Sequence, residues 1–194
     1  MAWDTEGTKR KILDAATAEF VARGPDGTTV EKIARAAGVN KERVYNYFGG
    51  KQGLFARVLA EQVTTASASV PIPAGSPEEV GEYAGRLFDY LTEHPQLLRL
   101  LQWEALTVPG EVTDEAKRAA MYADRSAELA HGQASGVLTD AFEASDLNIL
   151  ILGIVGYWGL LPQVSRMVTG STEVDARPRR RAAVVEAARR LVTP

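Results

Sequence analysis

The chain has 194 residues, of which 45% are hydrophobic and 24% are charged, a balance that suits one compact globular unit or two small ones. It contains no cysteine, which excludes disulfide bonds, thiolate nucleophiles and cysteine-ligated metals, and its two histidines exclude a histidine-rich metal site. No apolar signal segment follows the N-terminus, so a cytoplasmic protein is expected.

The small net charge of −3 conceals an asymmetry along the chain. Residues 1–57 carry ten Lys and Arg against seven Asp and Glu, whereas the rest of the chain carries 12 against 18. A basic N-terminal segment joined to an acidic body indicates a small domain that faces a polyanion.

Apolar residues recur at spacings of three and four, and no segment alternates as a strand would, so the fold class is predicted to be all-α. The first helix ends at the turn residues RGPDG, 23–27. Thr28 and Glu31 form a capping box that begins a second helix, which stops at Gly38. Asn40 caps a short third helix. One long helix followed by two short ones is the layout of a helix-turn-helix.

Six further helices are expected, which gives about nine in all. Their predicted ranges are 51–69, 77–94, 95–106, 114–132, 145–164 and 175 onward, with Ser76, Ser145 and Asp175 as caps of the fifth, eighth and ninth. The eighth contains the longest apolar stretch, which is shorter than the roughly 20 residues of a membrane span. No membrane partner is therefore expected, and Pro162 should kink this helix.

The stretch VYNYFGGKQGLF, residues 44–55, has the Gly-Lys pair of a nucleotide-phosphate loop. That loop also needs a glycine five residues earlier, a Ser or Thr after the lysine, and a preceding strand. Tyr45 and Gln52 occupy the two positions and the preceding segment is helical, so a nucleotide site is rejected. The glycines are interpreted as a break between helices, with Lys51 completing an anion site at the next helix N-terminus.

Residues 8–55 resemble the DNA-binding domain of the tetracycline-repressor (TetR) family. The resemblance lies in an apolar first helix, a Thr that opens the second, the motifs IARAAGV and YNYF, and a Lys that opens the fourth. It implies an N-terminal three-helix helix-turn-helix DNA-binding domain, residues 1–52, and a larger helical domain for ligand binding and dimerisation, residues 53–194.

The resemblance also implies DNA-binding roles, which helical geometry supports. Glu42, Arg43 and Asn46 should point away from Val44, which faces the core. With Lys41 they can reach base edges, where Arg43 suits guanine and Asn46 suits adenine. Phosphate contacts are expected from Thr29, Tyr45, Tyr47 and Lys51. A solvated helix face with packed tyrosines is the alternative, and Glu42, which repels phosphates, leaves the operator sequence open.

The resemblance further implies a dimer, and the eighth helix is apolar on nearly every side. Together with the last helix it is expected to pair with its symmetry mates in a four-helix bundle. The predicted interface consists of Leu150, Gly153, Tyr157, Val184, Ala188 and Leu191. An intramolecular core helix is the alternative.

A small-molecule pocket is predicted from aromatic and polar residues on the sixth to eighth helices. The predicted ligand-binding residues are Trp103, Glu104, Met121, Tyr122, Arg125 and Trp158. For each of them core packing is the alternative.

These expectations describe a ligand-responsive transcriptional repressor. It would bind a palindromic operator in double-stranded DNA as a homodimer, and an unidentified small-molecule inducer would release it by moving the fourth helix, which both domains share. The alternatives are an architectural protein with non-specific DNA contacts and a helical enzyme, although no nucleophile motif, metal cluster or dinucleotide motif is found. No catalytic residue, cofactor or metal is predicted.

Overall fold

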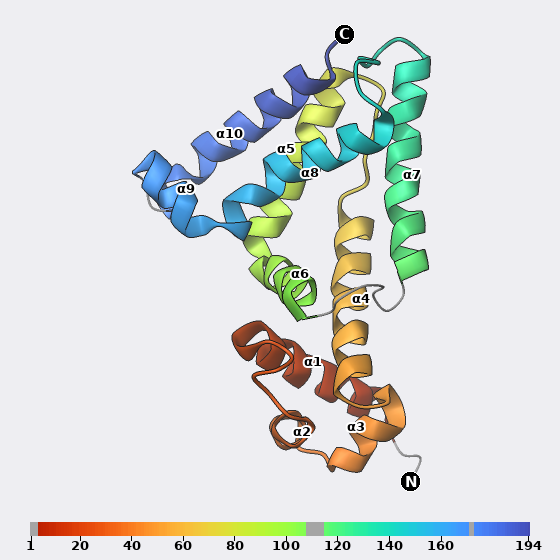
Figure 1. The fold of residues 1–194 in the computed structure, drawn as a ribbon, viewed down its shortest axis with the longest axis vertical. Coiled ribbons are helices and arrows are strands. Elements are labelled where there is room, and N and C mark those ends of the chain that lie inside the picture. The colour runs from red at the N-terminus through yellow and green to blue at the C-terminus, as the bar shows by residue number, and fades with distance from the viewer. Residues whose placement is uncertain (1–3, 108–114, 171–172) are drawn as a thin grey trace. The chain divides into compact units, whose positions relative to one another are not determined.

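The computed structural model describes residues 4–107, 115–170 and 173–194. These residues form ten α-helices and no strand, which confirms the all-α fold class (Figure 1). The helices are α1 (Thr5–Arg23), α2 (Val30–Ala37), α3 (Lys41–Phe48), α4 (Lys51–Ser69), α5 (Pro77–Glu93), α6 (Pro95–Thr107), α7 (Glu115–Ala134), α8 (Ala144–Leu160), α9 (Pro162–Thr169) and α10 (Glu173–Val192).

The additional helix arises where the predicted eighth helix breaks. α8 ends at Leu160 and α9 begins at Pro162, with a bend of 86° between them. Proline has no N–H to donate to the carbonyl of Trp158 and its ring clashes with that carbonyl, so it begins a helix better than it continues one. The single helix predicted for 145–164 is therefore wrong beyond Leu160.

Within the described ranges, no single helix is both long enough and apolar enough to cross a membrane. The bent pair of α8 and α9 meets the length and composition of a span only when its two helices are taken together.

The chain divides into two compact units. One combines the described residues of Met1–Thr65 with those of Arg99–Glu115, and the other combines Ala66–Leu98 with the described residues of Ala116–Pro194. Three helices contribute residues to both units, because the divisions after Thr65, after Leu98 and after Glu115 fall inside α4, α6 and α7.

The core of the first unit is built from α1, α2, α3 and the beginning of α4. Its fully buried side chains include Ile12, Ala16, Phe20, Ile33, Val44 and Leu54. Phe20 and Phe55 meet edge to face with ring centroids 5.1 Å apart, an arrangement that aromatic pairs favour. The four-residue spacing of the α1 members is the apolar periodicity expected from the sequence.

The start of α2 lies one residue later than predicted. Thr29, and not Thr28, is the N-cap, and its hydroxyl accepts a hydrogen bond from the N–H of Lys32 at 3.3 Å. Thr28 is buried and donates its hydroxyl hydrogen to Glu19 Oε2 at 2.7 Å. This hydrogen bond is the main cause that lowers the pKa of Glu19. A tertiary contact thus decides which of two adjacent threonines caps the helix.

Of the three N-caps predicted for later helices, one agrees with the structure. Ser76 caps α5 by accepting from the backbone N–H three residues on, at 3.2 Å, as predicted. The N-cap of α8 is Glu143 and not Ser145. Asp175 is not a cap, because α10 begins two residues before it, and Pro178 consequently lies inside that helix.

The centre of the second unit is formed by α5, α8 and α10 (Figure 1). Its buried side chains include Tyr83, Leu87, Leu147, Ile151, Val184 and Ala188. Gly81 lets α10 approach α5 closely, since a Cβ there would lie 2.9 Å from the carbonyl oxygen of Val185. Beside this contact, Arg181 Nε donates to Asp89 Oδ2 at 2.7 Å.

Gly24, which ends α1, supports the indole ring of Trp103 from α6. Its φ of 70° and ψ of 170° suit glycine alone, and a Cβ at this position would lie 2.8 Å from two atoms of the ring. Both residues belong to the first unit. Within that unit, α6 therefore packs directly on the end of α1.

Gly24→Ala is expected to lower the free energy of unfolding by about 1–3 kcal/mol from backbone strain, with a further loss from the displaced indole. Denaturant unfolding followed by circular dichroism measures the change. Gly38→Ala is the comparison variant, because Gly38 has a φ of 67° and a ψ of 33°, a left-handed conformation with less strain for other residues, and no atom lies within 4 Å of an added Cβ. Equal losses in the two variants would contradict the proposed contact with Trp103.

Candidate nucleic-acid interface

The turn between α2 and α3 fixes how α3 is presented. Gly38 is left-handed, and the N–H of Val39 donates to the carbonyl of Ala34 at 2.9 Å, which satisfies the end of α2. Val44 is fully buried in the middle of α3 and attaches that helix to the core along one side. The opposite side of α3 is consequently presented to solvent.

Four of the eight predicted DNA-binding residues form this solvent side of α3. They are Lys41, Glu42, Tyr45 and Asn46, all exposed. Positions i, i+1, i+4 and i+5 share one face of a helix at 100° per residue. This surface, called the α3 face below, combines an ammonium, a carboxylate, a phenol and an amide on eight residues of helix.

Arg43 and Tyr47 lie on the flank of α3 that faces α1, and both are partly buried. Arg43 Nη1 donates to Thr8 Oγ1 at 3.4 Å, and Lys9 Nζ lies 5.8 Å from the centre of the Tyr47 ring. The expectation that Arg43 points away from the core with Glu42 and Asn46 therefore needs correction. α1 packs beside α3 and draws this side chain toward itself.

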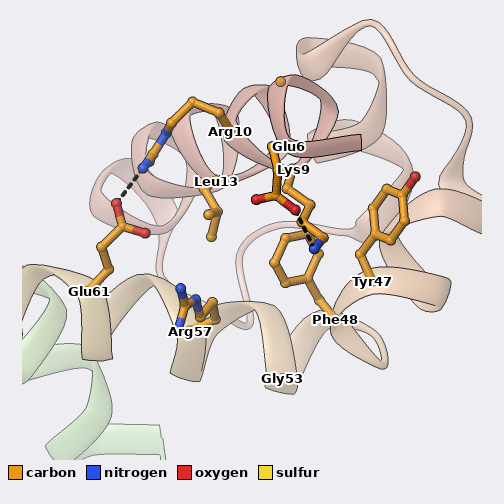
Figure 2. Close-up of a pocket in the computed structure, with 10 residues that line it drawn as sticks. Glu6, Lys9, Arg10, Leu13, Tyr47, Phe48, Gly53, Arg57 and Glu61 are labelled. Carbon is orange, nitrogen blue, oxygen red and sulfur yellow. Dashed lines mark hydrogen bonds and ion pairs between the residues drawn. The ribbon is translucent and has the colours of Figure 1, made fainter. Parts of the chain in front are cut away.

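Figure 2 shows an open groove in the first unit where Lys9 and Tyr47 meet. It is lined from α1, the end of α3 and the beginning of α4. Lys9 pairs with Glu6 at 2.8 Å, and Arg10 pairs with Glu61. Two of the cations in this groove are thus neutralised locally, which makes it a weaker candidate for phosphate contact than the α3 face.

Gly49 and Gly50 separate α3 from α4, as predicted. Their φ values are 71° and 114°, which glycine adopts without strain. Lys51 then opens α4, and its Nζ lies 3.6 Å from Oδ1 of Asp26, whose side chain is 82% exposed. Because this ion pair is so exposed, it is weak and is screened by salt. Another anion can therefore replace Asp26 as the partner of Lys51.

A second carboxylate holds Lys41 at the start of α3. Its Nζ lies 3.3 Å from Glu31 Oε1, and the pKa of Glu31 is lowered first by a hydrogen bond from its own backbone and then by that lysine. Thr29 is exposed nearby at the N-terminus of α2. From the sequence Glu31 was assigned only a capping role and Asp26 none, because both pairings depend on tertiary packing.

Comparison with known proteins identifies the family. Residues 12–58 match the model of bacterial regulatory proteins of the tetR family, and residues 79–190 match the tetracyclin repressor-like C-terminal domain. The chain belongs to the TetR family. Its relatives are transcriptional regulators, and the helix-turn-helix built from α2 and α3 is the DNA-binding part of such a protein.

Individual TetR-family relatives cover nearly the whole chain. The HTH-type transcriptional repressor SCO4008 of Streptomyces coelicolor is 38% identical over 192 residues, which are 98% of each chain. RutR of Escherichia coli K12 is 30% identical over 176 residues, 86% of this chain and 81% of RutR. The crystal structure of the regulator SCO4942 from Streptomyces coelicolor matches with a TM-score of 0.80 at 31% identity, covering 96% of this chain and 99% of that one.

The predicted ligand-binding residues of this TetR-family chain fall into separate groups. Trp103 and Glu104 belong to the first unit, where the Trp103 ring packs on Gly24. Trp158 lies under Arg180, whose guanidinium carbon is 5.3 Å from the ring centre. The three members on α7, in the second unit, are Met121, Tyr122 and Arg125.

Tyr122 and Arg125 lie beside two residues that were not predicted, Tyr83 and Asn148. Asn148 Nδ2 donates to the carbonyl of Tyr122 at 3.3 Å. Burial raises the pKa of Tyr83, while the charge of Arg125 acts in the opposite direction. The sequence carries a signal for Asn148, since it is a polar residue inside the most apolar helix.

The predicted dimer residues also separate. Leu150, Gly153 and Tyr157 are exposed on α8. Val184 and Ala188 are buried in the chain's own core, and Leu191 is partly buried against it. The apolar stripe of α10 thus packs against α5 and α8 of the same chain, which corrects the expectation that these positions face a symmetry mate.

Proposed function

We propose that this TetR-family regulator is a ligand-responsive repressor that binds a palindromic operator as a homodimer and is released by a small-molecule inducer. The observation that carries the proposal is the α3 face, a polar helix surface lying opposite the buried Val44. The major groove of B-DNA admits one α-helix, and the groups on this surface are of the types that read base edges there.

Each residue near α3 has a distinct proposed role. Asn46 suits the N6 and N7 atoms of adenine, and Glu42 suits the amino group of cytosine. Lys41 would reach a base edge after leaving Glu31, and Arg43 would reach guanine after leaving Thr8. The phosphate contacts are assigned to Thr29, Tyr45, Tyr47 and Lys51.

The dimer interface is proposed on the exposed side of α8. Leu150 and Tyr157 are 41% and 49% exposed, and an added Cβ on Gly153 would meet no atom within 4 Å. Large apolar side chains beside an open glycine are suited to close packing against a second helix. Two chains are needed because one short helix binds weakly, and a two-fold dimer offers two recognition helices to two half-sites.

The proposed functional boundary remains 1–52 for DNA binding and 53–194 for ligand binding and dimerisation. Communication between the two is assigned to α4 and α6, which contribute residues to both compact units. A ligand that shifts α6 would act on Trp103, which packs on Gly24. Ligand and DNA then oppose each other by linkage, typically by about 1–3 kcal/mol.

Equilibrium binding to DNA tests the proposal against an architectural protein that contacts DNA without reading it. A repressor should bind DNA sites enriched by selection about 10³-fold or more tightly than random DNA at physiological salt. A compound that the protein binds should lower that affinity. Equal affinity for the enriched and random DNA would favour the architectural alternative, and unchanged affinity with every bound compound would remove the inducer from the proposal.

Lys51→Ala is expected to weaken binding to all DNA sequences alike and to lower the salt slope of log affinity by about one, because one phosphate contact is lost. Fluorescence anisotropy at several salt concentrations measures both quantities. Asp26→Asn is the opposing variant and should tighten binding, since it frees Lys51. A change in base preference with Lys51→Ala would contradict its role as a phosphate contact.

A further inference from the structure

Three buried polar groups meet between α5, α7 and α8 of the second unit without satisfying one another. The side chains are Tyr83, 0% exposed, Asn148, 3% exposed, and Arg125, 9% exposed. The hydroxyl of Tyr83 and Oδ1 of Asn148 have no hydrogen-bond partner within the described ranges. A buried polar atom without a partner costs roughly 1–3 kcal/mol, so two such atoms close to the buried cation of Arg125 indicate a site that awaits a ligand.

The amide of Asn148 is oriented by its partners. Its Nδ2 donates to the carbonyl of Tyr122 at 3.3 Å and to Ser126 Oγ at 3.2 Å, while Ser126 Oγ donates to the same carbonyl at 3.1 Å. A carbonyl only accepts, so the NH2 group must face it and Oδ1 must face the other way. The unsatisfied Oδ1 is therefore a fixed acceptor for an external N–H or O–H.

Arg125 supplies a buried cation on α7, the helix to which the Asn148 amide is bound. It lies on α7 between Tyr122 and Ser126 in sequence, the two residues that bind Asn148, and its charge acts on Tyr83. In the part of the chain that the structure describes, no carboxylate pairs with Arg125. A guanidinium removed from water without an anion is costly, and its planar fork matches a carboxylate with two hydrogen bonds.

The apolar side chains around these polar groups indicate that the rest of the ligand is apolar. Leu129, one turn after Arg125 on α7, and Leu147 and Ile151, which flank Asn148 on α8, belong to the same apolar core as Tyr83. We propose that Arg125, Tyr83 and Asn148 form the recognition site for a small organic acid, with its carboxylate on Arg125 and Tyr83 and a hydroxyl or N–H donor toward Asn148. This inference rests on the ligand-responsive function proposed above and names the chemical class of its ligand.

Calorimetric titration of the full chain tests the proposal with matched acids and amides. The probes are benzoate, 4-hydroxybenzoate, phenylacetate and hexanoate, each paired with its uncharged primary amide. At least one acid should bind once per chain and about tenfold or more tightly than its amide, because only the acid pairs with the guanidinium. Absence of binding by all four acids up to about 10 mM, or equal binding of acids and amides, would overturn it.

Two variants separate recognition from folding. Arg125→Met should lower the affinity for the acid about tenfold or more, to the level of the amide. Tyr83→Phe removes only a hydroxyl without a partner, so the unfolding temperature should stay unchanged or rise while the affinity for the acid falls severalfold. An unfolding temperature that falls, with acid affinity unchanged, would assign the Tyr83 hydroxyl to the fold and contradict the site.

The outcome for this site and the outcome for the repressor are distinguishable. Calorimetry needs no DNA, so an acid that binds without releasing DNA would support the site and contradict the inducer function. Release of DNA by compounds whose binding is insensitive to both Arg125→Met and Tyr83→Phe would support the repressor and contradict the site.

Discussion

Leu150→Asp is expected to convert the dimer to a monomer and to lower operator affinity by about 100-fold or more. Leu150 is exposed on α8 beside Gly153 and Tyr157, and an aspartate there would have to lose its water when a second chain packs on it. Two linked recognition helices bind DNA about 10²–10⁴ times more tightly than one does, and a monomer loses this advantage. Analytical ultracentrifugation and DNA titration measure the two effects.

Leu106→Asp is the matched control for this loss. Leu106 is 77% exposed on α6, so the same change in charge and size is made on a helix outside the proposed interface. This variant should remain a dimer. If Leu150→Asp also stayed dimeric, or if its monomer held the operator as tightly as the unchanged protein, the interface on α8 would be rejected.

Arg43→Ala is expected to relax base preference at one position of each half-site by roughly 1–3 kcal/mol, about 5- to 150-fold in relative affinity. The physical reason is that a guanidinium bound to guanine O6 and N7 discriminates among bases, whereas a phosphate contact does not. To do so Arg43 must leave Thr8, to which its Nη1 donates at 3.4 Å. Competition among single-base operator variants measures the preference.

Arg43→Lys tests the same role with the charge retained. Lysine keeps the attraction to DNA but lacks the planar fork, so it should bind DNA strongly while discriminating less well at that base pair. Unchanged base preference in both Arg43 variants, with affinity lowered equally for all sequences in Arg43→Ala, would move Arg43 to the phosphate contacts.

Local signals predict the arrangement of the first unit well. The glycines at 38, 49 and 50 mark its turns, and the spacing of Ile12, Ala16 and Phe20 marks the buried side of α1. Such features depend on backbone conformation and helical period, which residues encode within a few positions. The helix-turn-helix layout was therefore accessible from the sequence.

Contacts between residues far apart in the sequence cannot be predicted from such local signals. The packing of Trp103 on Gly24 joins residues 79 positions apart, and no local pattern indicates it. The apolar stripe of Val184 and Ala188 was correctly expected to be covered, but a stripe does not specify what covers it, and α5 of the same chain does so. Arg43 was misplaced for the same reason, because α1 competes for its side chain.

Selection of bound sites from random-sequence DNA by the purified protein tests the central claim most directly. A homodimeric repressor that reads DNA through the α3 face should enrich an inverted repeat. Its half-sites should lie roughly 34–36 Å apart, centre to centre, or a multiple of that distance. Recovery of DNA without a shared sequence, or of a single asymmetric site bound by one chain, would contradict the account.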